Sequence, residues 1–197
     1  SGHSWRLMQG ISFTRLAIHE VSLEIDKGRV YIEDQINFDK SISNLAQSYE
    51  FISSSETKLF LNFLNNDLKP YEQLETNSFY WPRLSSEVNG FINWSWSAEE
   101  IVAFCNAFDK PFAGASTFIK GSKVNFSNVE IAYEDYSFHP FQAGLIYRVR
   151  GSDLFVAARQ GGICVKELKL SENINIREGL RFVTPDDVLL SALTTQI

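Results

Sequence analysis

The feature that most constrains the fold is a series of short β-type segments between residues 115 and 170. Apolar and β-branched residues fill these segments, and glycine-containing stretches, such as those at Gly121 and Gly151, separate them. About five short strands at this spacing are typical of a small antiparallel barrel. We therefore expect a small, closed or half-closed β-barrel in the second half of the chain.

A helix is predicted directly before these strands. Ser97 stands three residues before Glu100, which is the spacing of a capping box, where each side chain satisfies the free backbone N–H of the other residue. Pro111 is expected to end the helix. The apolar spacing predicts a buried face made of Ile101, Phe104, Cys105 and Phe108.

The first part of the chain has a different order of predicted elements. Residues 13–21 and 29–38 are predicted strands. Asp39 or Ser41 is the expected cap of a following helix that reaches residue 66, and its serine cluster at 53–55 is compatible with one helix or with two. The first ten residues offer neither a chain start nor a first strand, so we expect a fragment of a longer protein.

Residues 69–90 are polar and turn-prone, contain two prolines and show little periodicity, so we interpret them as a linker. The expected organisation is an α/β part over residues 1–68, the linker, and the barrel domain over residues 91–197. Trp94 and Trp96 are expected to pack between these two domains. Gly161 and Gly162 are expected to form a hairpin turn.

Charge and cysteine content exclude several classes of protein. The net charge of -6 and the pI near 5.1 argue against a broad nucleic-acid surface. No apolar run approaches the roughly 20 residues that a membrane span requires. Cys105 and Cys164 are isolated in apolar surroundings, which is typical of reduced core thiols in a cytoplasmic protein.

One acidic residue interrupts the two predicted N-terminal strands. Asp26-Lys27-Gly28 fits an ordinary turn, in which Asp26 bonds its own backbone and Gly28 takes the positive φ angle. Asp26 also fits an acid held at the lip of a sheet for chemistry. His19 has no Cys, His or carboxylate at metal-ligand spacing, so we expect no metal site.

Two long segments resemble a known family in the family's own order. "WRLMQGISFTRLAIHEVSLEIDKGRVYIEDQINF" resembles the second half of the catalytic domain of the 10-formyltetrahydrofolate-dependent formyltransferases. "FINWSWSAEEIVAFCNAFDKPFAGASTFIKGSKV" resembles the start of their C-terminal domain, and "GLRFVTP" resembles a segment near its end. The similarity extends to methionyl-tRNA formyltransferase and to the amino-sugar-nucleotide formyltransferases, and it covers most of residues 4–185.

This resemblance implies both a fold and a site. The fold is an α/β remnant of a Rossmann-like formyltransferase domain, followed by a small OB-like β-barrel with one helix. The Asp-x-Gly pattern places the family's catalytic carboxylate at Asp26, where it relays a proton while an amine attacks the formyl carbonyl. Leu23, Glu24 and Ile25 are expected to line the pteridine pocket of 10-formyltetrahydrofolate.

The chain departs from the family pattern in one important respect. The family's Asn-x-His-Pro-Ser segment, which supplies two further catalytic groups, does not occur in these 197 residues. We therefore expect no transfer by this chain alone, and an exposed sheet edge that a missing N-terminal half or a second chain covers.

The acceptor amine stays open between an amino-sugar nucleotide and methionyl-tRNA. From residue 88 onward, twelve acidic residues against ten basic ones favour the smaller acceptor. The alternative function is a non-catalytic binding module derived from a formyltransferase.

Overall fold

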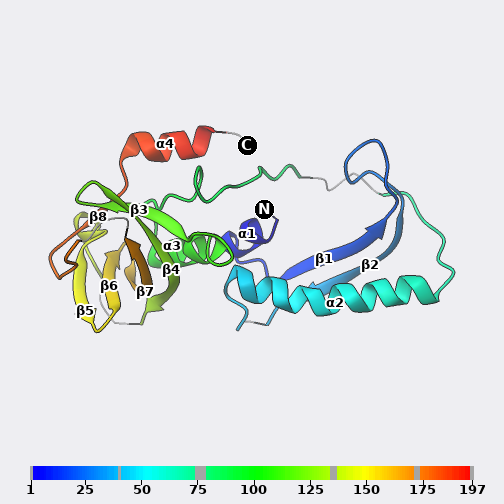
Figure 1. Cartoon of the computed structure of the whole chain (residues 1–197), viewed down its shortest axis with the longest axis horizontal. Helices are drawn as coiled ribbons and strands as arrows, with labels where there is room; N and C mark the ends of the chain where they lie inside the picture. The colour runs from blue at the N-terminus through cyan, green and yellow to red at the C-terminus, as the bar shows by residue number, and fades with distance from the viewer. Residues whose placement is uncertain (1, 40, 74–78, 134–136, 171–173, 196–197) are drawn as a thin grey trace.

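The computed structural model describes residues 2–39, 41–73, 79–133, 137–170 and 174–195. Figure 1 shows an α/β part and a barrel part side by side along the longest axis, with an extended segment running between them. Within the described residues, no helix combines the length and the hydropathy needed to cross a bilayer.

The α/β part is a two-stranded antiparallel ribbon with one long helix packed along it (Figure 1). Its elements are α1 (Gly2–Met8), β1 (Phe13–His19), β2 (Val30–Asn37) and α2 (Leu45–Asn65). Both predicted strands are confirmed, although β1 ends at His19. Helix α1 was not predicted. The α2 residues Leu45, Ile52 and Leu59, at seven-residue spacing, are buried.

The start and the continuity of α2 differ from the sequence expectation. Asn44 is the N-cap rather than Asp39 or Ser41, because its side chain accepts from the Gln47 backbone N–H and the Gln47 side chain returns the bond. The serine cluster does not break the helix. The Ser54 hydroxyl donates to the Phe51 carbonyl within the same helix, which satisfies the polar group locally.

A buried arginine holds the α/β part together. Arg6 on α1 donates from Nη1 to the Ile11 carbonyl (3.0 Å) and from Nη2 to Ser48 Oγ on α2 (2.6 Å). Its guanidinium carbon lies 3.7 Å from the centre of the Phe38 ring, just after β2. Burial lowers the pKa of Arg6. One side chain thus joins the helix α1, the helix α2 and the end of β2.

The barrel part is a six-stranded antiparallel sheet curled into a half-barrel (Figure 1). The strand order is β5-β6-β7-β4-β3-β8. Backbone hydrogen bonds between residues 144–146 and 179–182 connect the two ends of this sheet. The strands are β3 (Ala115–Ile119), β4 (Ser122–Ala132), β5 (Ile146–Arg150), β6 (Asp153–Ala158), β7 (Gly161–Leu170) and β8 (Phe182–Val183).

The predicted helix is α3 (Ala98–Ala107), and its capping box is confirmed. Ser97 Oγ accepts from the Glu100 N–H, and the Glu100 carboxylate accepts from the Ser97 N–H. All four predicted core residues, Ile101, Phe104, Cys105 and Phe108, are buried. The expectation of one helix in the barrel part was wrong, because α4 (Asp186–Thr194) and a short 3-10 turn (Pro140–Gln142) are also present.

Two further sequence expectations need correction. The hairpin turn between β6 and β7 is made by Arg159 and Gln160, whereas Gly161 and Gly162 are already paired with β6. Trp94 is not an inter-domain residue: it is 9% exposed in the barrel core and stacks on Phe182.

The segment from residue 66 to residue 97 contains no helix or strand among its described residues, apart from single bridges such as Val30 with Tyr71. Residues 74–78 of the expected linker lie outside the described residues. The domain boundaries at 68 and 91 stay a prediction.

The buried indole N–H of Trp94 is bound by a hydroxyl chain of two threonines. Its Nε1 donates to Thr117 Oγ1 (3.0 Å), which lies 3.0 Å from Thr184 Oγ1. Thr117→Val keeps the side-chain shape but leaves the Trp94 N–H without an acceptor, so we expect unfolding to become easier by about 1–3 kcal/mol. Urea denaturation measures this change.

The matched control is Thr57→Val, which alters an exposed hydroxyl on α2 and is expected to change stability by less than about 0.5 kcal/mol. Equal urea midpoints for the Thr117 variant and the unmodified chain would contradict the assigned role of the hydroxyl chain.

Candidate functional site

Asp26 lies in the loop that joins β1 to β2, at the end of the ribbon remote from the barrel (Figure 1). Its side chain is 85% exposed. Its φ angle of 58° is in the left-handed region, which Asp tolerates better than most residues. The left-handed residue of this turn is therefore Asp26 and not Gly28, contrary to the turn interpretation of the sequence.

Gly28 is required for a different reason. A Cβ atom at this position would lie 1.8 Å from the Glu20 carbonyl oxygen, well inside any permitted contact. The two sides of the loop approach closely here, and the Glu20 N–H donates to the Arg29 carbonyl at 2.9 Å. The absence of a side chain at Gly28 thus lets the loop close directly above the ribbon.

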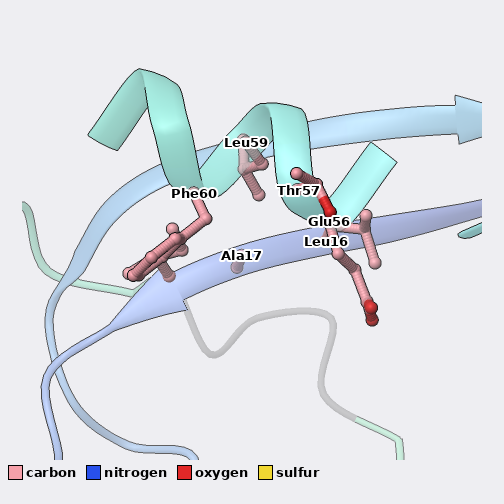
Figure 2. A pocket seen from close by; sticks show the side chains of 7 residues that line it. Leu16, Ala17, Glu56, Thr57, Leu59 and Phe60 are labelled. Atoms are coloured by element: carbon pink, nitrogen blue, oxygen red, sulfur yellow. The ribbon is translucent and has the colours of Figure 1, made fainter. Parts of the chain in front are cut away.

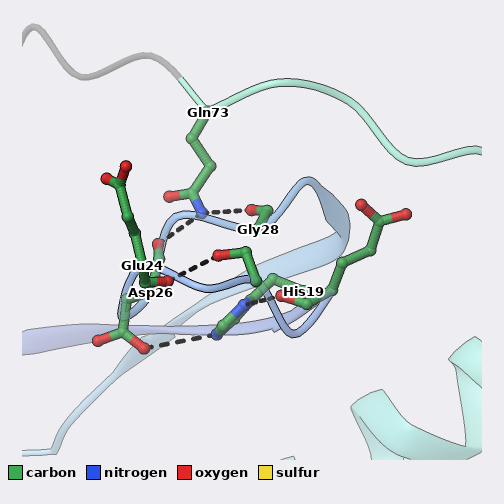
Figure 3. Close-up of polar contacts among 7 residues, drawn as sticks. His19, Glu24, Asp26, Gly28 and Gln73 are labelled. Atoms are coloured by element: carbon green, nitrogen blue, oxygen red, sulfur yellow. Dashed lines mark hydrogen bonds and ion pairs between the residues drawn. The ribbon is translucent and has the colours of Figure 1, made fainter.

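A glutamine from the segment after α2 holds the same loop. Gln73 Nε2 lies 2.8 Å from the Asp26 carbonyl oxygen and 2.6 Å from that of Gly28, and donates to both (Figure 3). Ser22 Oγ also donates to the Glu24 carbonyl at 2.6 Å. These bonds fix the backbone on both sides of Asp26 without engaging its carboxylate.

His19 forms a pair with Asp26. Its Nε2 lies 3.7 Å from Asp26 Oδ1, and its Nδ1 lies 2.9 Å from the Glu20 carbonyl oxygen (Figure 3). Because a carbonyl only accepts, Nδ1 carries a proton and Nε2 faces the carboxylate. An imidazole and a carboxylate in this arrangement can share or relay one proton.

The neighbouring carboxylate is engaged differently. Arg29 donates from Nε to Glu20 Oε2 at 2.9 Å and from Nη2 to Glu20 Oε1 at 2.7 Å. These hydrogen bonds lower the pKa of Glu20 and raise the pKa of Arg29. The guanidinium is thereby held by Glu20 at the base of the loop.

The three residues expected to line a cofactor pocket are at the surface. Leu23 is fully exposed and Ile25 is 90% exposed, and Glu24 is exposed as well. Apolar side chains in water beside a carboxylate are typical of a surface that receives another molecule or segment. Their role as binding residues stays a prediction.

A hollow of about 440 Å³ lies between β1 and α2 (Figure 2). Its walls are mostly apolar and include Leu16, Ala17, Leu59 and Phe60. Strand β1 pairs with β2 on one side only among the described residues, so its other edge is unpaired.

The described residues contain no cluster of three or more His, Cys, Asp or Glu side chains that would hold a metal ion.

The close approach at Gly28 can be tested with Gly28→Ala. The added methyl group must push the loop away from the Glu20 carbonyl, so we expect a loss of about 1–3 kcal/mol in stability. The Glu20 amide, which bonds to Arg29, should also exchange faster with solvent, as measured by NMR hydrogen exchange.

Gly2→Ala is the control, because no atom lies within 4 Å of the position that its methyl group would take and its backbone is helical. Gly2→Ala should leave the stability unchanged or slightly higher, and it should leave the exchange rate of the Glu20 amide unchanged. Unchanged exchange at Glu20 in the Gly28 variant would show that the loop is not closed by this contact.

Residues 85–181 match the family described as "Formyl transferase, C-terminal domain". Among curated proteins, the chain is 22% identical over 136 residues to the bifunctional polymyxin resistance protein ArnA of Wigglesworthia glossinidia brevipalpis. That match covers 68% of this chain and 21% of ArnA.

Solved structures share the fold over a larger part of the chain. HypX from Aquifex aeolicus in complex with tetrahydrofolic acid superposes with a TM-score of 0.64 at 19% identity, covering 97% of this chain and 32% of HypX. WlaRD, a sugar 3N-formyl transferase, gives a TM-score of 0.57 at 16% identity, over 88% of this chain and 61% of WlaRD.

Methionyl-tRNA formyltransferase from Clostridium thermocellum gives a TM-score of 0.59 at 14% identity, over 88% of this chain and 63% of that enzyme. The chain thus spans between about a fifth and two thirds of the length of these relatives. Residues 85–181 thus match the formyl transferase C-terminal domain, and the chain shares its fold with formyltransferases of solved structure.

Proposed function

We propose that this chain is part of a formyltransferase that moves a formyl group from 10-formyltetrahydrofolate to a primary amine. The observation that carries the proposal is the pairing of His19 with Asp26 on a loop whose backbone is held by Gln73. Structures of relatives in complex with tetrahydrofolic acid, or in the presence of 5-N-formyl-THF, support a folate as the formyl donor.

The chemistry requires a proton acceptor. Bound 10-formyltetrahydrofolate would supply the formyl carbon. An amine that forms a new C–N bond to this carbon must lose a proton, while the bond to the folate nitrogen breaks and tetrahydrofolate leaves with a proton on that nitrogen. The exposed carboxylate of Asp26 is free to take this proton directly or through a water molecule. His19 Nε2 lies 3.7 Å from Asp26 Oδ1, and an imidazolium with a second proton on Nε2 would hold the ionised carboxylate in position.

Asp26 alone does not complete such a site. The resemblance implies an Asn and a His from an Asn-x-His-Pro-Ser segment, and these groups would stabilise the charge that develops on the formyl oxygen. The 197 residues contain no such segment. We therefore assign the activity to a larger polypeptide and expect this chain alone to be inactive.

We assign the acceptor to the amino-sugar-nucleotide class. The barrel side chains Lys110 and Lys166 are paired with Glu167 and Glu130, which reduces the positive charge that a tRNA backbone would need. The net charge of -6 also disfavours binding of a tRNA backbone. A non-catalytic binding module is the second candidate function, and the missing Asn-x-His-Pro-Ser segment favours it.

We also place the protein in the cytoplasm. Both cysteines, Cys105 and Cys164, are free and buried, and burial raises the pKa of each thiol. Such thiols stay protonated and unreactive, as is typical of a reducing compartment.

The catalytic assignment is tested with Asp26→Asn in the full polypeptide that contains these residues. We expect transfer from 10-formyltetrahydrofolate to an amino-sugar nucleotide to fall by about 10²–10⁴-fold, because the amide cannot accept the proton. Formyl transfer to methionyl-tRNA, measured in parallel, should be absent both from the unmodified polypeptide and from the Asp26→Asn variant.

Asp34→Asn is the matched control, since it removes an equally exposed carboxylate from β2 and should keep full activity. Near-normal turnover in the Asp26 variant would refute its role. If the unmodified polypeptide transferred the formyl group only to methionyl-tRNA, the assignment of an amino-sugar-nucleotide acceptor would be wrong. If it transferred the formyl group to neither acceptor, the non-catalytic binding module would be favoured.

We further propose that the free edge of β1 and the adjoining hollow receive the missing N-terminal half of the catalytic domain. The hollow is open and mostly apolar, with Glu56 and Thr57 on its α2 side, and Phe60 at its border is 53% exposed (Figure 2). An uncovered strand edge beside apolar side chains readily pairs with another chain. In the isolated 197-residue chain, the same surface should drive self-association.

Sedimentation equilibrium measures this association. Phe60→Lys places a charge in the hollow and should shift the isolated chain toward monomer. Leu190→Lys, on the equally exposed face of α4, should leave the association unchanged. A stable monomer of the unmodified chain at all concentrations would contradict the proposal.

A further inference from the structure

We propose that a cavity between α1, α3 and α4 binds a small planar aromatic anion. The cavity has a volume of about 500 Å³, which is within the usual range for small-molecule sites. It is lined by residues of the N-terminal helix, of the segment before the barrel, and of the C-terminal helix. This site is separate from Asp26, and the proposal does not depend on formyl transfer.

Six aromatic side chains line the cavity. They come from α1, from the segment between α2 and α3, and from α3 with its C-terminal end, and they are Trp5, Tyr80, Phe91, Trp96, Phe104 and Phe108. The rings of Trp96 and Phe104 are 5.0 Å apart, and those of Phe104 and Phe108 are 4.8 Å apart. Walls of this kind favour a flat ring system, which gains stacking contacts as well as burial.

Hydrogen bonds hold the elements around the cavity in place. Trp5 Nε1 donates to the Pro82 carbonyl at 2.8 Å, which fixes the segment before the barrel against α1. Asn89 Nδ2 donates to the Ala192 carbonyl at 2.7 Å and thereby holds α4 over the cavity. Asn89 Oδ1 accepts from the Ser85 N–H, so both ends of this amide are engaged.

Two polar groups at the cavity select the charge of the ligand. Arg83 is exposed and forms no ion pair with any described residue, and it lines both this cavity and an adjoining hollow with Ser4 and Tyr49. Asn93 accepts from the Ser95 N–H through Oδ1, and its Nδ2 donates to no described residue. An unengaged guanidinium and an amide N–H both favour an anion.

The lining of this cavity contains no carboxylate side chain to oppose this charge, and Glu87 belongs to the adjoining hollow. Rings inside the cavity and an anionic group at the Arg83 border therefore define one ligand class, a planar aromatic ring system that carries a single carboxylate, sulfonate or phosphate. The aromatic anion 8-anilinonaphthalene-1-sulfonate matches this class and reports binding by its fluorescence. N-phenyl-1-naphthylamine is its neutral counterpart with the same ring skeleton.

The test compares these two probes on the 197-residue chain. We expect both to bind, with energy transfer from the tryptophans that line the cavity. Arg83→Gln should weaken the sulfonate probe by about tenfold, the size expected for one charge-assisted contact, and leave the neutral probe unchanged. Ala192→Phe, which fills the cavity from α4, should weaken both probes.

Arg177→Gln is the control, because it removes an exposed arginine that does not line the cavity, and it should change neither affinity. Equal effects of Arg83→Gln on the two probes would overturn the charge selection. Binding that survives Ala192→Phe in a variant with normal thermal unfolding would place the probes elsewhere, for example on the exposed Leu23 loop. If Ala192→Phe does not fold, the Arg83 comparison alone decides.

Discussion

The buried guanidinium of Arg6 is the interaction on which the arrangement of the α/β part depends. A two-stranded ribbon with one helix has little core of its own, and an isolated hairpin is only marginally stable. Arg6 joins α1 to Ser48 of α2 and to the Phe38 ring beside β2, so it links the elements of this part through one side chain. Among the described residues, no carboxylate forms an ion pair with it.

The same short helix connects the two parts of the molecule. Trp5, next to Arg6, bonds the segment that enters the barrel and also lines the cavity under α4. The α/β part and the barrel are therefore not simply joined by a flexible connection. A change that displaces α1 would disturb the ribbon through Arg6 and the cavity through Trp5.

The sequence predicted well those features whose signals are local. The capping box at Ser97 and Glu100, the buried face of α3 and the strand-rich barrel follow from spacings of a few residues, and all three are present. The contacts of Asp26 were not predictable in this way. His19 reaches it across a loop and Gln73 comes from beyond α2, so neither partner is adjacent in the sequence. Trp94 was misplaced for the same reason, since its partner Thr117 lies 23 residues away on β3.

The two hydrogen bonds from Gln73 have a mechanical consequence. Gln73 belongs to the segment that follows α2, yet its side-chain amide donates hydrogen bonds to the backbone of the turn that carries Asp26. The position of the turn that carries the acid therefore depends on the course of the chain just after α2 as well as on the ribbon, so Gln73 acts on a residue 47 positions earlier in the sequence.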